Sequence, residues 1–223
     1  MKLFIDSADV NKIQLLNDYY SIDGVTTNPS IIVKEGKPYL PLLKDIQSSI
    51  GTEKELFVQA IADMAENIVE EAKYIQDSLQ GNIVIKIPVT SEGLKAIKLL
   101  SRMGIRTLAT TVYTPMNAYL AAKAGASYVA PYVNRIDNLS GNGIQVVKDI
   151  VEIFAKSNFN CEVLAASFKN TQQVLEVCLA GAQGVTASPD IIEAFLKVPS
   201  IKENVETFSK EWYGLYGSNS LLD

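Results

Sequence analysis

The chain has 223 residues, 48% of them hydrophobic, and its 25 acidic and 20 basic side chains give a net charge of -5. This length can bury a large core, and basic residues are neither in excess nor clustered, which argues against nucleic-acid or membrane-surface binding. Histidine is absent, which excludes Ser-His-Asp and Cys-His nucleophiles and disfavours a His-bearing zinc site. Any proton transfer must therefore use Asp, Glu, Lys, Tyr, Cys or water.

The two cysteines, Cys161 and Cys178, form neither a metal-ligand nor a redox motif, and a reducing compartment would keep both as thiols. The N-terminal apolar stretch reaches Asp6 too early for a signal peptide. No apolar run approaches the roughly 20 residues that span a bilayer. We therefore expect a cytoplasmic protein without a membrane partner.

Apolar strands and helical patterns alternate from the start of the chain. Residues 2–6 form a strand that ends in Asp6, and a helix capped within residues 7–9 continues to Tyr20. A second strand leads to Asn28 and Pro29, which suit a helix cap and the first helical position. The elements that follow the first helix are a strand at 24–27, a helix at about 41–50, a strand at 56–60 and a helix at about 63–79.

The fourth strand, residues 82–90, has the sequence NIVIKIPVT and is apolar on both faces apart from Lys86 and Thr90. Such a strand is typical of a parallel sheet covered on both sides. Burial there disfavours the charged amine and lowers its pKa. A neutral amine can attack a carbonyl, as a Schiff-base lysine does. The alternatives are a lysine that reaches solvent at the strand end or one that pairs with a buried carboxylate.

The same alternation continues to the end of the chain. The remaining elements are a helix at about 91–104, a strand at 107–112, a helix at about 115–125, a strand at 128–133, a polar loop at 137–143, a helix at 144–159, a strand at 162–167, a helix at about 171–180, a strand at 184–187 and helices near 189–196 and 201–216. Eight alternating strands predict an α/β fold, a single (β/α)8 TIM barrel over residues 1–223 with a C-terminal helical extension. The rival is a doubly wound open sheet, which usually has a Gly-rich phosphate turn after its first strand; residues 6–9, DSAD, are not one.

A barrel carries its active site at the C-terminal ends of the strands. The polar side chains that end these strands are Asp6, Asn28, Gln59, Lys86, Thr110, Tyr132, Ser167, and Thr186 or Ser188. Taken singly, Asp6 and Asn28 can be helix caps, Thr110 a strand residue, and Tyr132 a core aromatic. Together they predict a site for a polyhydroxylated carbonyl compound.

Arg135 follows the sixth strand and precedes a loop that contains glycine. An arginine in such a place can brace the loop. Its guanidinium can also hold a phosphate bidentately, helped by the Ser167 hydroxyl, and we favour this second interpretation.

Five segments of the chain resemble the small-subunit transaldolase and fructose-6-phosphate aldolase family. They are residues 6–9 (DSAD), 24–30 (GVTTNPS), 84–90 (VIKIPVT), 130–137 (APYVNRID) and 164–169 (LAASFK). The resemblance implies a (β/α)8 barrel in which Lys86 forms the Schiff base and serves as the electron sink, without a metal or an organic cofactor. It also implies a homo-oligomer, a pentamer or decamer, in which the helix at 201–216 reaches a neighbouring subunit.

Two positions resemble a switch within this family. Transaldolases generally carry glutamate at the end of the third strand and phenylalanine on the sixth, whereas fructose-6-phosphate aldolases carry glutamine and tyrosine. Gln59 and Tyr132 therefore imply an aldolase that converts fructose 6-phosphate to dihydroxyacetone and glyceraldehyde 3-phosphate, and the reverse. By this resemblance the catalytic residues are Lys86, Tyr132, Gln59, Thr110 and Asp6, and the substrate-binding residues are Asn28, Arg135 and Ser167.

Two other functions remain open at this point. A transaldolase of the pentose phosphate pathway would use the same lysine to transfer a dihydroxyacetone unit between sugar phosphates. A barrel without catalytic activity could bind sugar phosphates or serve as a scaffold. The expected partners are in each case small sugar phosphates and hydroxyketones.

Overall fold

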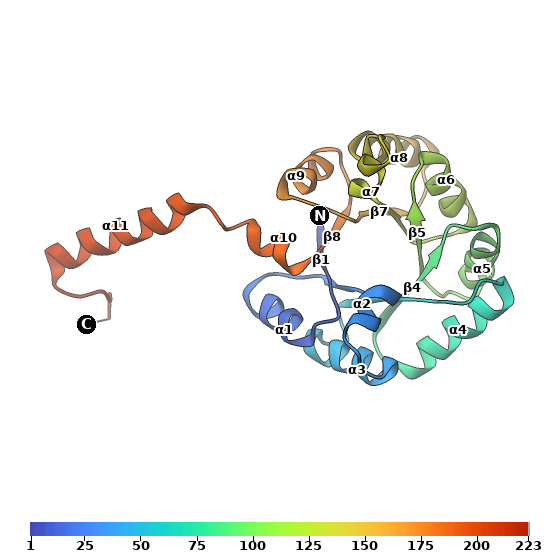
Figure 1. The fold of residues 1–223 in the computed structure, drawn as a ribbon, viewed down its shortest axis with the longest axis horizontal. Coiled ribbons are helices and arrows are strands. Elements are labelled where there is room, and N and C mark those ends of the chain that lie inside the picture. Colours follow the sequence, from blue (N-terminus) through green and yellow to red (C-terminus); the bar gives the residue numbers. More distant parts are fainter. Residues whose placement is uncertain (223) are drawn as a thin grey trace. The chain divides into compact units, whose positions relative to one another are not determined.

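The strands of the protein close into a parallel barrel, as seen in a computed structural model that describes residues 1–222 (Figure 1). The strands pair in sequence order, and the last pairs with the first. They are β1 (Lys2–Asp6), β2 (Gly24–Thr26), β3 (Glu55–Gln59), β4 (Asn82–Pro88), β5 (Thr107–Val112), β6 (Tyr128–Pro131), β7 (Glu162–Ala165) and β8 (Gly184–Ala187). The predicted (β/α)8 barrel is confirmed, and the open doubly wound sheet is excluded.

Helices follow the strands along the chain, and Figure 1 shows α1, α3, α4, α5, α6, α8 and α9 around the barrel. They are α1 (Val10–Tyr19), α2 (Pro29–Lys34), α3 (Tyr39–Ile50), α4 (Ala65–Ser78), α5 (Ser91–Arg102), α6 (Pro115–Ala124), α7 (Val133–Asn138), α8 (Gly143–Ser157), α9 (Thr171–Leu179), α10 (Pro189–Ala194) and α11 (Pro199–Tyr216). Polar side chains begin several of them: Asp9 accepts a hydrogen bond from the Lys12 amide, and Asn28 one from the Ile31 amide. These caps turn the chain from strand into helix at the strand ends.

The sixth strand differs from its prediction. The sequence pattern extends it to residue 133 and places a loop after it, but β6 ends at Pro131 and α7 begins at Val133. Val133 and Ile136 are buried at a spacing of three, which is helical, and the Ile136 amide donates to the Tyr132 carbonyl. The first helical residue, Val133, is apolar and directly extends the apolar run of the strand. The sequence pattern therefore does not reveal this helix of 6 residues. Arg135 therefore lies on a helix and not on a strand end.

The interior of the barrel has its own apolar core. Its members are Phe4, Phe57, Val84, Leu108, Tyr128, Ala130, Leu164 and Ala166, with Tyr132 packed against them. The Phe57 ring makes edge contacts with Phe4 at 5.1 Å and with Tyr128 at 5.3 Å between ring centroids. Because side chains alternate along a strand, Val84 inside the barrel places Lys86 inside as well. This core is the floor of the cavity that contains the lysine.

A polar cluster lies at the N-terminal ends of the strands. The Lys2 amine donates to the Tyr128 hydroxyl at 2.7 Å and to the Glu162 carboxylate at 2.8 Å. The Tyr128 hydroxyl donates to Glu55 at 2.9 Å, and Arg106 pairs with Glu55 at 2.5 Å. Burial raises the pKa of Tyr128 to about 12, although the hydrogen bond from Lys2 opposes this rise. The phenol is therefore neutral and can donate to Glu55 while it accepts from Lys2.

We expect Phe57→Ala to lower the free energy of unfolding by about 3–5 kcal/mol, because it removes a fully buried ring from the barrel interior. Phe57→Leu, which keeps most of the apolar volume, should lose much less. Urea denaturation followed by circular dichroism measures both variants. Equal losses in the two variants would contradict the packing role assigned to the ring.

The chain divides into two compact units, Met1–Ile192 and a second that begins at Glu193. Within the second, α11 carries the exposed apolar side chains Val205, Phe208, Trp212 and Leu215, and the Trp212 and Tyr216 rings lie 4.3 Å apart. That a neighbouring subunit packs against this helix stays a prediction. Among residues 1–222, no helix has the length and apolar content needed to cross a membrane.

Candidate functional site

Lys86 is buried inside the barrel near the C-terminal end of β4. It pairs in register with Gln59 of β3 and Leu108 of β5, and only 6% of its surface is exposed. Its amine donates a hydrogen bond to the main-chain carbonyl of Thr27 at 2.5 Å. Burial lowers the pKa of this amine, and the negative charge of Asp6 partly opposes the effect. A neutral amine can donate to Thr27 and keep its lone pair for a carbonyl carbon.

A cavity of about 130 Å³ opens beside this amine, and we call it the central cavity. All the predicted site residues except Gln59 line it: Asp6, Asn28, Lys86, Thr110, Tyr132, Arg135 and Ser167. The cavity wall also includes Thr26 and Thr186, together with the apolar Leu108, Ala130 and Ala166. The barrel thus gathers residues that are more than a hundred positions apart in the sequence around one lysine.

The Asp6 carboxylate is held by a chain of hydroxyl groups. The Thr26 hydroxyl donates to an Asp6 oxygen at 2.7 Å, and the Thr26 and Thr186 hydroxyl oxygens are 2.6 Å apart. Because Thr26 gives its proton to Asp6, Thr186 must donate to Thr26. One carboxylate oxygen is fixed in this way, and the carboxylate places a negative charge near the Lys86 amine.

Tyr132 presents its hydroxyl on another side of the central cavity. Its oxygen lies 2.7 Å from the Thr110 hydroxyl, whose residue is fully buried. The ring packs edge-on against Tyr113 at 5.8 Å between centroids, and the Arg135 guanidinium carbon is 4.7 Å from the Tyr132 ring centroid. The phenol is therefore fixed by three neighbours, and it is a group that can carry a proton beside Lys86.

Two residues at this end of the barrel have a left-handed backbone without being glycine. Thr111 has a φ of 59° and Ser167 a φ of 63°. Thr111 lies where the register between β5 and β6 shifts, and its hydroxyl donates to the Thr110 carbonyl at 2.6 Å. Such a backbone costs about 1–2 kcal/mol for an L-residue, and strain of this kind is often found at functional sites.

The helix α7, which carries Arg135, is fastened to the segment that carries Ser167. The Asn134 amide donates to the Ser167 carbonyl at 2.7 Å. The Gln173 side chain accepts from the Lys169 amide at 2.7 Å and donates to Asp137 at 2.8 Å. This network ties the backbone on either side of Arg135 to the segment around Ser167, and both residues line the central cavity.

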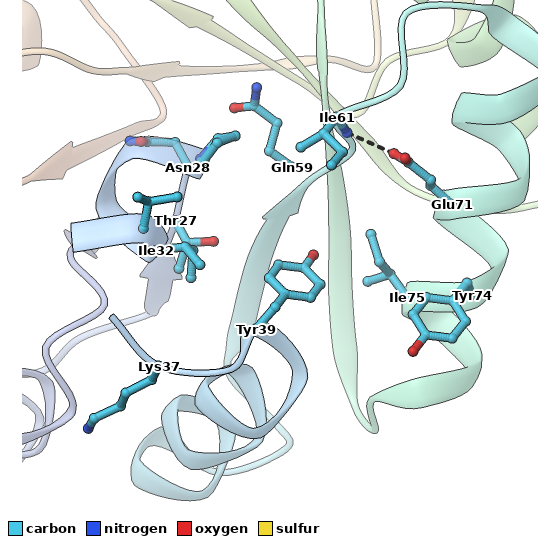
Figure 2. A pocket seen from close by; sticks show the side chains of 12 residues that line it. Thr27, Asn28, Ile32, Lys37, Tyr39, Gln59, Ile61, Glu71, Tyr74 and Ile75 are labelled. Carbon is cyan, nitrogen blue, oxygen red and sulfur yellow. Dashed lines mark hydrogen bonds between the residues drawn. The ribbon is translucent and has the colours of Figure 1, made fainter. Parts of the chain in front are cut away.

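Gln59 lies on the wall of a second, larger cavity, which we call the side cavity (Figure 2). Thr27 and Asn28 line it as well, and Asn28 is shared with the central cavity. Figure 2 shows the Asn28 and Gln59 side chains toward the top of the view and the Tyr39 ring below them. Gln59 is thus the register partner of Lys86, while its side chain contributes to the neighbouring hollow.

Sequence reasoning missed Thr26 and Thr27. Thr26 could be found from alternation along the second strand, because it falls on the inward face together with Asp6 of the paired strand. Thr27 accepts the Lys86 hydrogen bond with its main-chain oxygen. Such a contact cannot be predicted from the type of the side chain, because every residue has this oxygen. Among residues 1–222, no group of three or more Cys, Asp or Glu side chains is placed to hold a metal ion.

Comparisons with known proteins identify a family and a fold. A family model described as transaldolase/fructose-6-phosphate aldolase matches residues 3–218. The chain is also similar to the crystal structure of inosine 5' monophosphate dehydrogenase from Legionella pneumophila, with 14% sequence identity and a TM-score of 0.59. That match covers 86% of this chain and 58% of the other, so this chain spans little more than half of its length, and the likeness concerns the fold alone.

Proposed function

The chain belongs to the transaldolase/fructose-6-phosphate aldolase family, and we propose that it is a Schiff-base aldolase that cleaves fructose 6-phosphate into dihydroxyacetone and glyceraldehyde 3-phosphate. The reverse reaction is the synthesis of fructose 6-phosphate. One observation carries the proposal: the buried amine of Lys86 shares its cavity with the hydroxyl of Tyr132. A nucleophile and a group that can exchange protons are both needed for a carbonyl to become an iminium.

The reaction begins with neutral Lys86. Its nitrogen attacks the ketone carbon, the carbonyl oxygen takes up a proton, and the carbinolamine then loses water to form an iminium on Lys86. Tyr132 gives and takes the protons of these steps, directly or through one water, while Thr110 orients its hydroxyl. Burial of the Lys86 amine favours its neutral form and therefore promotes the attack on the ketone.

The iminium next accepts the electrons of the bond between C3 and C4. As this bond breaks, the C4 hydroxyl loses its proton and becomes the aldehyde of glyceraldehyde 3-phosphate, and an enamine remains on Lys86. Protonation of the enamine at C3 restores an iminium, and addition of water releases dihydroxyacetone and free Lys86. Tyr132 is the group that receives the C4 proton and later returns one to C3.

The remaining polar groups bind the substrate. Asp6 and Asn28 accept and donate hydrogen bonds to its hydroxyl groups, and Asp6 is held for this purpose by Thr26. Arg135 and Ser167 lie on one rim of the cavity and bind the phosphate, which a guanidinium can hold bidentately. The amino acid at position 59 favours an aldolase over a transaldolase, since glutamine lacks the carboxylate base that a glutamate would provide there.

Incubation of the purified protein with fructose 6-phosphate, without an acceptor aldehyde, tests the proposal. We expect release of free dihydroxyacetone and glyceraldehyde 3-phosphate over many turnovers, because water hydrolyses the iminium. Both products can be followed by coupled assays. Release that stops near one equivalent per site, and resumes as sedoheptulose 7-phosphate when erythrose 4-phosphate is added, would show a transaldolase.

A further inference from the structure

Thr186 on β8 lies in the wall of the central cavity but has no part in the mechanism given above. The sequence pattern left Thr186 and Ser188 as alternatives at the end of this strand, and of the two it is Thr186 that lines the cavity. The residue is buried, with 4% of its surface exposed. Because a buried hydroxyl is normally hydrogen-bonded, its partner indicates which group it serves.

The partner of Thr186 comes from a strand that is not its neighbour. β1 pairs with β2 on one side and with β8 on the other, so Thr26 and Thr186 belong to the two strands that flank β1. Their hydroxyl oxygens are nevertheless 2.6 Å apart, and Thr26 is buried as well. The two side chains therefore meet inside the barrel, where the Asp6 side chain at the end of β1 joins them.

The Asp6 carboxylate sets the direction of this chain of hydrogen bonds. A carboxylate only accepts, so Thr26 uses its single proton for Asp6 Oδ1 at 2.7 Å, and Thr186 in turn donates to Thr26. Hydrogen bonds that point the same way along a chain strengthen one another. Within residues 1–222, the other carboxylate oxygen, Asp6 Oδ2, makes no hydrogen bond and is available to a substrate in the cavity.

We propose that Thr186 is a positioning residue of this site: its hydroxyl, acting through Thr26, fixes one oxygen of Asp6 so that the other faces the substrate held on Lys86. The inference rests on the proposed function, since Asp6 binds the substrate hydroxyl groups there. In this role Thr186 contacts no reacting atom. Its whole effect on the reaction passes through the orientation of the carboxylate.

A pair of variants isolates the hydroxyl of Thr186. Thr186→Ser and Thr186→Ala both lose the methyl group, and they differ from each other only in the hydroxyl. We expect Thr186→Ala to lower kcat/KM for fructose 6-phosphate about tenfold, the size of one lost hydrogen bond in a chain that ends on a charged group. Thr186→Ser should stay close to wild type. Inhibition by inorganic phosphate should change little in either variant, because the relay ends on Asp6.

A double-mutant cycle with Thr26 tests whether Thr186 acts through it. Thr26→Ala breaks the chain next to Asp6 and should cost at least as much as Thr186→Ala. The double variant should be no slower than Thr26→Ala alone, because Thr186 then has no path to the carboxylate. Losses that simply add in the double variant would overturn the proposal, since Thr186 would then act by another route.

Thr107→Ala is the matched control. Thr107 is a fully buried threonine of β5, and within residues 1–222 its hydroxyl has no hydrogen-bond partner. The substitution removes the same atoms from a strand without touching the relay, so kcat/KM should stay close to wild type. Thr186→Val removes the hydroxyl but keeps the volume, and it should also lose turnover if Thr186→Ala folds poorly by circular dichroism.

Borohydride trapping of dihydroxyacetone on Lys86 separates this proposal from the proposed function. If wild type forms the adduct but transfers the unit only to erythrose 4-phosphate, the aldolase assignment fails, and the same cycle measured on that transfer supports or overturns the relay. If wild type forms no adduct on Lys86, both proposals fail. Wild-type turnover by Thr186→Ala, or an equal loss in Thr186→Ser and Thr186→Ala, would refute the relay and leave the aldolase in place.

Discussion

Lys86→Met is expected to abolish covalent trapping of dihydroxyacetone and to lower turnover of fructose 6-phosphate by roughly 10⁴-fold or more, a loss of the size seen when nucleophiles are removed from other enzymes. Methionine has a similar length and suits the apolar surroundings, but it has no amine to attack a carbonyl. Borohydride trapping and the coupled assay measure the two effects. Lys95→Met, at an exposed lysine of α5, is the matched control and should retain activity.

The same variant has an expected effect on stability that depends on pH. The pKa of Lys86 in the folded protein lies below the ordinary value of 10.5. Between these two pKa values the unfolded chain binds a proton that the folded protein does not, so wild-type stability rises with pH in this window. Lys86→Met lacks this dependence and should unfold at a higher temperature than wild type at neutral pH, with a difference that shrinks toward pH 10.5.

A Lys86→Met protein with near-full activity would refute the mechanism. A variant that is inactive but also less stable than wild type at neutral pH would refute a different point, namely that burial of the amine opposes folding. In wild type, kcat/KM should rise with pH as free Lys86 loses its proton, along a limb whose pKa lies below 10.5.

Tyr132→Phe is the second large effect that we expect. It keeps the ring against Tyr113 and beneath Arg135, and it removes the hydroxyl that pairs with Thr110. Loss of a positioned acid or base costs about 10²–10⁴-fold, so kcat for cleavage of fructose 6-phosphate should fall by that factor. Inhibition by inorganic phosphate, which our proposal assigns to Arg135 and Ser167, should change little.

Thr110→Val is the control for this prediction. It removes the partner of the phenol but leaves the phenol itself, so its loss in kcat should be smaller than that of Tyr132→Phe. Borohydride trapping by Tyr132→Phe during long incubation should still modify Lys86. Equal losses in cleavage and in phosphate inhibition would mean that Tyr132 shapes the cavity instead of moving protons.

The barrel and most of its site follow from strand patterns in the sequence. The segment 82–90 is apolar on both faces except at Lys86, and alternation places Lys86 on the face of Val84, which lies inside the barrel. Once eight strands are recognised, most polar strand ends are directed to the same cavity, and Asp6, Thr110 and Tyr132 are all there, whereas Gln59 lines the side cavity. The closed barrel brings together side chains that are far apart in the sequence but occupy equivalent positions at the ends of their strands.

Other features have no local pattern. The short helix α7 is hidden because Val133 extends the apolar run of β6. The bulge at Thr111 depends on how two strands pair, and the side cavity depends on how α2, α3 and α4 pack around the end of β3. These are properties of tertiary packing, which single-sequence periodicity does not contain.

The acceptor of the Lys86 hydrogen bond is a main-chain oxygen of Thr27. Every amino acid at position 27 supplies the same oxygen, so a change of side chain there leaves the acceptor itself in place. The contact includes no buried carboxylate, which would hold the amine as an ammonium group. Side chains of the cavity wall can therefore change while the Lys86 amine keeps this acceptor. The hydrogen bond that orients the lysine is in this sense independent of the amino-acid types that line its cavity.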